Sequence, residues 1–426
     1  MDLIVKGGQT LSGVIRPSGN KNASVALVPA TLLFDKPVKF TNVPDITDVS
    51  RLINILIKLG SVVNWNKDKK TLIIDNSKVS LKNINKEDVG PMRGTALLWG
   101  PMLSRFRKVD FDELPGGCTL GARPLDSHYE AFSALGVKVQ VDNKKTRMDA
   151  SKARAGTVWL TEMSPTVTEN MIMLAVNLPG HTRIIGAASE PNVQDLCKFL
   201  NNCGADISGI GSSILEINGG KKITPVEHRI LPDHYEIATF LALGAATGGR
   251  VRVEDAIPEH FSFINHIFSK FNVKIEYDNN SAVVDANQKI MIKSNRGALQ
   301  VKAQPWPGLP VDMLPLFMPL ALVANKKTVL FHNWMYESGL FWTSEFQKYG
   351  ADVLLADPHR VLITGGNKLY GTEIEAPYII RAVVSLMMAA MVSEGESRIL
   401  NADAIYRGHP NFVENLRKLH AEIREA

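Results

Sequence analysis

The chain has 426 residues, of which 45% are hydrophobic and 21% are charged, and its formal net charge is +5. This length exceeds one ordinary hydrophobic core, so we expect a globular protein with two domains. The charge is mild and forms no basic helix, which argues against nucleic acid as a partner, and no apolar run of about 18 residues indicates a membrane span.

The chain begins with a predicted β-strand in residues 1–8 and not with the apolar core of a signal peptide. The segment 17–23 then follows a strand and opens a helix. Small residues at a helix start beside Lys21 favour an anion site, although a capped turn alone would also explain them. It is not a P-loop, because the required Gly-x-x-x-x-Gly-Lys-Ser/Thr spacing is missing.

A helix followed by a short strand recurs six times along the chain. Apolar residues at helical spacing end each time at a turn residue, and the turn residues lie 68 to 78 positions apart: Gly60, Gly136, Gly204, Asn272, Gly350 and His420. Glycine and asparagine tolerate the left-handed conformation that ends helices, so His420 is the weakest match. Periods near 70 are too long for solenoid repeats, so each copy is predicted to be a small α/β unit.

Strand pairs joined by tight turns follow many of these helices, as in residues 273–284. The predicted fold class is therefore α/β with a partly antiparallel sheet, and not an open parallel sheet. Six units most simply form two domains of three units each. Helix starts are expected after apparent caps near Asp45 and Glu190.

The segment 114–124 places Cys118 in a loop with three glycines, five residues before Arg123. A nearby cation favours the reactive thiolate, and glycines allow a loop to close over a ligand, although a plain glycine-rich turn is the alternative. Cys197 and Cys203 lie on an apparent helix and are expected to pack in the core. Three sparse cysteines argue against disulfides and favour a cytoplasmic location.

Taken together, these features resemble the enolpyruvyl transferases, and within them the branch that acts on UDP-N-acetylglucosamine. The similarity runs from end to end, and it is carried by residues 18–22, Met92-Arg93, the loop 116–124, residues 310–313, Arg381-Ala382 and Arg407-Gly408. EPSP synthase of the same family has the same fold but lacks the cysteine loop.

The resemblance implies two inside-out α/β barrel domains, each built from three repeats of about 70 residues, with substrates bound between them. One domain would comprise 1–20 and 232–426, and the inserted domain 21–231 would carry the Cys118 loop. The implied substrates are phosphoenolpyruvate and UDP-N-acetylglucosamine. No cofactor and no metal is implied.

The same resemblance assigns roles to individual residues. Cys118 matches the acid that acts on the enol carbon, and Asp312 matches the base at the sugar 3′-hydroxyl. Cations for the phosphate are also implied: Lys21, Arg123 and Arg407, with Arg381 near them. The remaining implied contacts to the substrates are Asn22, Arg93, Pro124, Leu125, Asp126, Ser127, His128, Ser164 and Met335.

The chain departs from the family at several of these places. Glu162 stands where a Lys is usual, Pro165-Thr166 where Val-Gly is usual, and Leu314-Pro315 where a Gln is usual. The other departures are His234 and Gly339, each in place of an Arg, and Ile379 in place of an Asp. Two alternatives therefore stay open. One is a paralogue with another nucleotide or sugar acceptor, and the other is a catalytically silent relative with a binding role.

Overall fold

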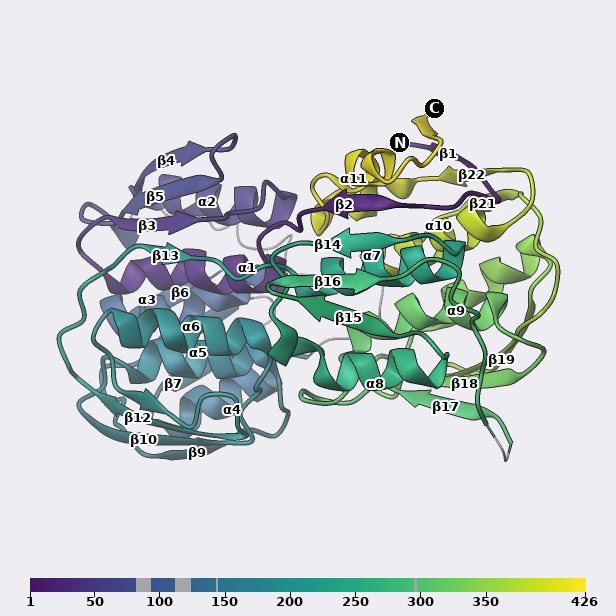
Figure 1. Cartoon of the computed structure of the whole chain (residues 1–426). Helices are drawn as coiled ribbons and strands as arrows, with labels where there is room; N and C mark the ends of the chain where they lie inside the picture. Colours follow the sequence, from purple (N-terminus) through teal and green to yellow (C-terminus); the bar gives the residue numbers. More distant parts are fainter. Residues whose placement is uncertain (82–92, 112–123, 143–144, 295–296) are drawn as a thin grey trace. The chain divides into compact units, whose positions relative to one another are not determined.

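The computed structural model describes residues 1–81, 93–111, 124–142, 145–294 and 297–426 (Figure 1). They divide into two compact units. The terminal unit holds the described residues of Met1–Ser18 and Pro232–Ala426, and the inserted unit those of Gly19–Gly117 and Arg123–Leu231. No helix among the described residues is long and apolar enough to cross a membrane.

The described part of the terminal unit contains three four-stranded sheets. In order across each sheet, the strands are β21 (Glu373–Glu375), β22 (Glu396–Leu400), β1 (Leu3–Lys6) and β23 (Ile423–Glu425); β15 (Ile275–Asp278), β16 (Ser281–Val284), β14 (Val251–Val253) and β2 (Gly13–Ile15); and β17 (Leu299–Lys302), β18 (Thr328–His332), β20 (Arg360–Thr364) and β19 (Asp352–Asp357).

The inserted unit repeats this plan. Its described strands form sheets in the orders β13 (His228–Arg229), β3 (Val38–Thr41), β5 (Thr71–Asp75) and β4 (Val62–Asn66); β11 (Ile207–Ser208), β12 (Ile214–Gly219), β10 (Gly180–Ile185) and β9 (Thr157–Trp159); and β6 (Lys108–Phe111), β8 (Lys145–Asp149) and β7 (Lys138–Asp142). In every four-stranded sheet one edge pair is parallel and the other pairs are antiparallel, so the expectation of a mixed sheet is confirmed.

Helices lie at the centre of each unit, and the sheets pack on their outside. The inner helices are α7 (His234–Thr247), α9 (Met318–Val323) and α10 (Ile380–Val392) in the terminal unit, and α1 (Lys21–Ala30), α3 (Trp99–Phe106) and α5 (Pro165–Ala175) in the inserted unit. Residues 381–391 of α10 are all buried, as expected for a helix that is covered on every side. This arrangement is the expected inside-out α/β barrel.

The six predicted turn residues end six helices in the same way. The helices are α2 (Thr47–Leu59), α4 (Asp126–Ala134), α6 (Pro191–Asn202), α8 (Ser262–Lys270), η7 (Phe341–Tyr349) and α11 (Phe412–Lys418). Each turn residue has a positive φ, including His420 at 66°. Its N–H bonds the carbonyl three residues back, and the next N–H bonds the carbonyl five residues back, as in the pairs Gly60–Ile57 and Ser61–Leu56. These are the bonds of the Schellman motif, which satisfies the last carbonyls of a helix.

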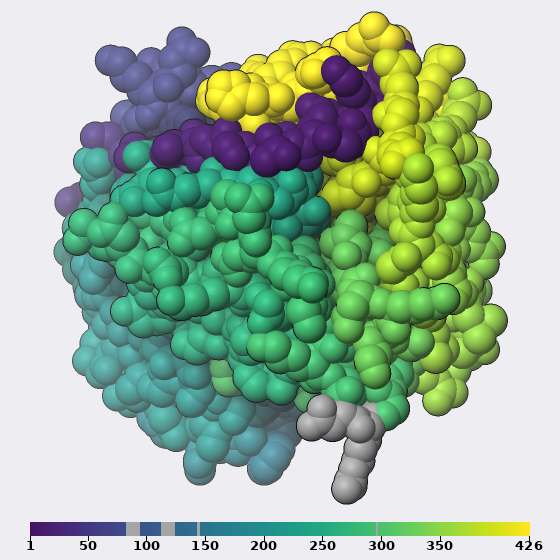
Figure 2. Space-filling view, turned by 45° about the vertical axis from the view of Figure 1, so that its right-hand side comes forward, coloured from purple at the N-terminus to yellow at the C-terminus, as the bar shows by residue number. Residues whose placement is uncertain are grey.

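The first strands of the chain complete sheets made of much later residues. β1 lies between β22 and β23, with Leu3 opposite both Ile399 and Glu425, and β2 pairs in parallel with β14. In Figure 2 the purple N-terminal chain accordingly lies between yellow C-terminal residues and teal residues. The N-terminal strand β1 therefore completes the sheet of the sixth repeat.

Two expected helix caps are wrong in detail. α2 begins after Ile46, whose side chain cannot cap, and α6 begins after Glu190, which makes no side-chain cap bond. The two helices do begin in the expected places. Cys197 and Cys203 are buried in and at the end of α6, as expected, and burial raises the pKa of these thiols to about 12 and about 11.

Candidate functional site

The cysteine loop and part of its surroundings lie outside the described residues. Cys118 and Arg123 both fall in the segment 112–123, so their placement stays a prediction. Arg93 begins the 3-10 helix η4 (Arg93–Leu98), but only its backbone is described. The other expected site residues are placed in one unit or the other.

In the inserted unit, the start of α1 carries Lys21 and Asn22. Asn20 caps the helix, because its side-chain oxygen accepts a 2.8 Å hydrogen bond from the Ala23 N–H. The Lys21 ammonium lies 3.0 Å from the Asp48 carboxylate, and only 18% of the lysine side chain is exposed. Lys21 is therefore held at the helix start, where the helix dipole also favours an anion.

The segment 124–128 leads into α4. Pro124 and Asp126 are exposed, Ser127 is half-buried and Leu125 is buried. His128 is only 1% exposed, and both of its ring nitrogens lie within 3.2 Å of protein atoms, at Asn170 and Thr166. His128 is thus a buried residue that packs beneath the exposed residues of this segment.

Ser164 lies directly before α5, whose first residue is Pro165. Proline suits this position, because the N–H that it lacks has no partner within a helix. The Ser164 hydroxyl lies 3.3 Å from the Thr166 hydroxyl, which in turn contacts His128. The structure thus brings together two expected site residues through Thr166, which the sequence had marked only as a departure.

In the terminal unit, Asp312 lies half-buried in the first turn of η6 (Val311–Phe317), which packs against α10. Arg381 lies in the first turn of α10 and is 7% exposed. Its guanidinium lies 5.0 Å from the centre of the Tyr235 ring and donates a hydrogen bond to His409 Nε2. An aromatic face and a neutral imidazole both suit a buried cation.

Arg407 and Arg381 belong to two short segments that contact each other twice. The Arg407 guanidinium lies 5.0 Å from the centre of the Tyr378 ring, three residues before Arg381. His409, two residues after Arg407, accepts the hydrogen bond from Arg381. These contacts bring together the two segments that carry the expected phosphate cations. Sequence reasoning missed Tyr378 and His409, because neither residue type signals such a role by itself.

Met335 is 37% exposed and follows strand β18. The nearby Gly339 is packed so closely that a β-carbon there would lie 2.2 Å from the Asn333 side-chain nitrogen. Asn333 is buried, and its side-chain oxygen accepts from the Met335 N–H at 3.2 Å. The packing around position 339 therefore leaves no room for an arginine side chain without a shift of Asn333.

His234 is fully buried at the start of α7, among the rings of Tyr235, His260 and Trp306. Burial, followed by the charges of His260 and Arg381, holds the pKa of His234 well below its usual range. Asp233 caps this helix through bonds of 2.8 and 3.1 Å from the N–H groups of Tyr235 and Glu236. The imidazole is therefore neutral where the family's arginine would be charged.

Comparisons with known proteins agree with this architecture. Residues 5–416 match the family described as EPSP synthase (3-phosphoshikimate 1-carboxyvinyltransferase). Solved structures similar to this chain include the enolpyruvyl transferase NikO from Streptomyces tendae, at a TM-score of 0.86 and 20% identity, covering 99% of this chain and 98% of that chain. EPSP synthase from Acinetobacter baumannii has a TM-score of 0.72 at 15% identity and full coverage of both chains.

Similar curated relatives carry one name, UDP-N-acetylglucosamine 1-carboxyvinyltransferase. The relative from Borreliella burgdorferi is 38% identical over 99% of this chain and 98% of its own length. The relative from Treponema denticola is 36% identical, with the same two coverages. These similarities, together with two helix-centred units of matching topology, show that the chain belongs to the EPSP synthase-like family of enolpyruvyl transferases.

Proposed function

We propose that this protein transfers the enolpyruvyl group of phosphoenolpyruvate to the 3′-hydroxyl of UDP-N-acetylglucosamine and releases phosphate. The observation that carries this proposal is the similarity to relatives with that name, at 32–38% identity over 99% of the chain. The reaction would be the first committed step of peptidoglycan synthesis in the cytoplasm. The paralogue and the silent relative have no comparable support.

The described residues suit the chemistry of the substrates. Phosphoenolpyruvate carries a phosphate and a carboxylate, and the two contacting segments that hold Arg381 and Arg407 would supply two guanidinium groups. Lys21, fixed beside Asp48, would supply a third cation. Asn22, Arg93, residues 123–128, Ser164 and Met335 would contact or organise the nucleotide sugar.

The proposed reaction has two steps. In the first, the 3′-oxygen attacks C2 of phosphoenolpyruvate, Asp312 takes the hydroxyl proton, and Cys118 donates a proton to C3, giving a tetrahedral ketal. In the second, phosphate leaves C2 and the Cys118 thiolate takes a proton back from C3, which yields the enol ether, while the proton held by Asp312 passes to the released phosphate. Cys118 would also be the nucleophile toward phosphoenolpyruvate and toward the epoxide antibiotic fosfomycin.

A phosphate-release assay with phosphoenolpyruvate and a panel of acceptors tests the proposal. We expect release with UDP-N-acetylglucosamine, and at least about 100-fold slower turnover in Asp312→Asn, which keeps the size of the side chain but removes the base. Release only with another nucleotide or sugar would favour the paralogue. Phosphate release with none of the acceptors would favour the silent relative.

A further inference from the structure

A chain of hydrogen bonds connects the buried interior of the inserted unit to Ser164. It runs from Asn170 in α5 to His128 in α4, at 3.2 Å, and from His128 to Thr166, also at 3.2 Å. The last link joins the Thr166 and Ser164 hydroxyls at 3.3 Å. Asn170 is fully buried, whereas Ser164 is half-buried.

The direction of this chain is set at its buried end. The Gly100 N–H donates to the side-chain oxygen of Asn170 at 2.7 Å, and the Asn170 nitrogen donates to the Ala96 carbonyl at 2.9 Å. These two bonds identify which atom of the Asn170 side-chain amide is the oxygen and which is the nitrogen. The NH2 group therefore faces His128 Nδ1, and this ring nitrogen must accept.

Because Nδ1 accepts, neutral His128 carries its proton on Nε2. That N–H points at the Thr166 hydroxyl, which accepts it. A proton on Nδ1 would instead face the Asn170 NH2 group. The edge-on contact with the Trp99 ring, at 5.5 Å between centroids, keeps this imidazole out of water.

Thr166 then has its own proton to give, and among the described residues its remaining partner is the Ser164 hydroxyl. The main chain of Ser164 is already used, because its N–H bonds the Glu162 carbonyl and its carbonyl accepts from Thr168. Pro165, the next residue, has no N–H. The Ser164 hydroxyl proton is therefore the side-chain donor that this helix start can offer to a ligand, beside the first-turn N–H groups of Thr166 and Val167.

We propose that Thr166 is a positioning residue, which with His128 and Asn170 sets the Ser164 hydroxyl as a hydrogen-bond donor toward an acceptor oxygen of the nucleotide sugar. The inference rests on the proposed function, since it requires that sugar nucleotide at Ser164. The usual Val-Gly pair of the family has no side-chain oxygen at this position. The Thr166 hydroxyl therefore distinguishes this protein from that family pattern.

Calorimetric titration of UDP-N-acetylglucosamine into the full-length protein tests this role. We expect Thr166→Val to weaken binding roughly 5- to 30-fold, the scale of one hydrogen bond with a stranded polar partner, and Thr166→Ser to restore it. At saturating nucleotide sugar, kcat and the KM for phosphoenolpyruvate should stay within about twofold of the wild type. Thr161→Val is the matched control, because it removes an exposed hydroxyl from the same segment, one that bonds Glu130.

Unchanged binding by Thr166→Val would overturn the inference. Equal weakening in the Val and Ser variants would also overturn it, because the Ser variant keeps the hydroxyl on which the inference depends. A wild-type protein that does not bind UDP-N-acetylglucosamine would instead contradict the proposed function itself, and this inference with it. If Thr166→Val does not fold, nitrogen NMR of the wild type decides. We expect the His128 proton to be on Nε2. A proton on Nδ1 would overturn the direction of the hydrogen bonds from Asn170 to Ser164.

Discussion

His409 is the residue that we expect to set the position of Arg381. It is fully buried, accepts the hydrogen bond from the guanidinium and packs at 5.2 Å against the Phe412 ring. His409→Phe keeps a ring but removes the acceptor, so the KM for phosphoenolpyruvate should rise roughly 5- to 150-fold, as for a lost bond to a charged group. Steady-state kinetics with each substrate varied in turn measures this effect.

The control for this prediction is His409→Gln, whose side-chain oxygen can accept from Arg381. It should recover most of the affinity for phosphoenolpyruvate, and neither variant should change the KM for UDP-N-acetylglucosamine by more than about twofold. A similar rise in both KM values would mean that His409 supports the fold in general and does not act through Arg381.

The three cysteines should differ sharply in reactivity. Burial raises the pKa of Cys197 to about 12 and of Cys203 to about 11, so neither forms a thiolate near neutral pH. Cys118 is therefore the expected target of fosfomycin, and Cys118→Ser should abolish alkylation. Peptide mass spectrometry reads out the modified residue, and an adduct on Cys197 or Cys203 would contradict the assignment.

At the scale of elements, the six helix ends show how much a local pattern can predict. Positive φ at Gly60, Gly136, Gly204, Asn272 and Gly350 follows from residue type and spacing, because few residues tolerate that conformation. His420 adopts it at 66° although histidine is not favoured there. The N–H groups of His420 and Ala421 make the same pair of bonds as in the other copies, so the repeat overrides the local preference.

The hydrogen bonds that connect Asn170 to Ser164 could not be predicted in the same way. Asn170, His128 and Thr166 lie on two helices, and their contacts depend on how α4 packs against α5. The reciprocal contacts of Arg381 and Arg407 likewise join residues that are far apart in sequence. Sequence patterns and family resemblance thus predict which segments carry the site, while tertiary packing decides which side chains support it.

Substitutions at two helix ends test how much each turn residue's own preference for a positive φ contributes to stability. Gly350 has a φ of 87°, so Gly350→Ala should lower the free energy of unfolding by about 1–2 kcal/mol. His420→Gly should leave it unchanged or raise it by up to about 1 kcal/mol, because glycine adopts this conformation without strain. Denaturant titration of both variants gives the two values, and destabilisation by His420→Gly would mean that the imidazole makes a stabilising contact.

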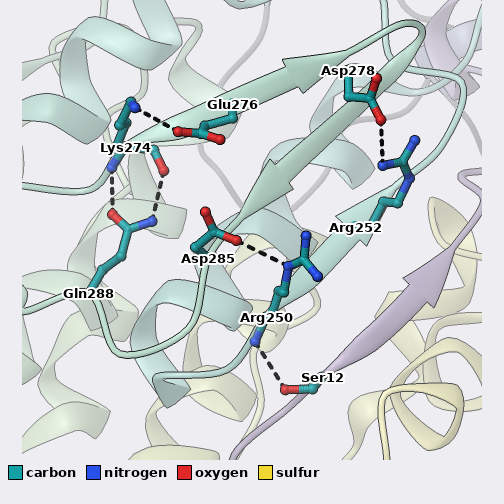
Figure 3. Close-up of polar contacts among 8 residues, drawn as sticks. All are labelled: Ser12, Arg250, Arg252, Lys274, Glu276, Asp278, Asp285 and Gln288. Atoms are coloured by element: carbon teal, nitrogen blue, oxygen red, sulfur yellow. Dashed lines mark hydrogen bonds and ion pairs between the residues drawn. The ribbon is translucent and has the colours of Figure 1, made fainter.

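Exposed ion pairs contribute little by comparison. On the sheet of β15, β16 and β14, Arg250 pairs with Asp285 and Arg252 with Asp278, each at 3.0 Å (Figure 3). Lys274 also contacts Glu276, at 2.6 Å. Exposed pairs of this kind are typically worth about 0–1 kcal/mol, so the buried face of this sheet, and not its charged face, stabilises the unit.

At the scale of the whole molecule, two buried groups limit stability at opposite ends of the pH range. In the terminal unit, the pKa of His234 is lowered well below its usual range by burial. In the inserted unit, burial raises the pKa of Glu169 to about 8, with a smaller contribution from the charge of Glu190 and a bond from Asn192 that opposes the shift. Each unit should therefore respond to pH in its own direction.

For Glu169, the folded chain keeps a proton that the unfolded chain loses near pH 4.5. The stability that this proton contributes is fully present below that pH and is lost as the pH rises to about 8. For His234, the unfolded chain gains a proton near pH 6.5 that the folded chain cannot take, so stability falls as the pH drops below that value. Each group changes the free energy of unfolding by at most about 1.4 kcal/mol per pH unit.

Scanning calorimetry between pH 5 and 8.5 should therefore show the inserted unit weakening toward high pH and the terminal unit toward low pH. Glu169→Gln cannot ionise and still accepts the 2.8 Å hydrogen bond from Asn192 through its side-chain oxygen. It should reduce the loss of stability on the alkaline side and leave the acidic side unchanged. Part of the alkaline loss should remain, because burial also raises the pKa of Glu190 in the same unit to about 7. His234→Phe should flatten the acidic side and leave the alkaline side unchanged. If Glu169→Gln lowers stability at pH 8 as much as at pH 5, then the glutamate is not protonated in the folded protein, and its burial must be balanced by another charge.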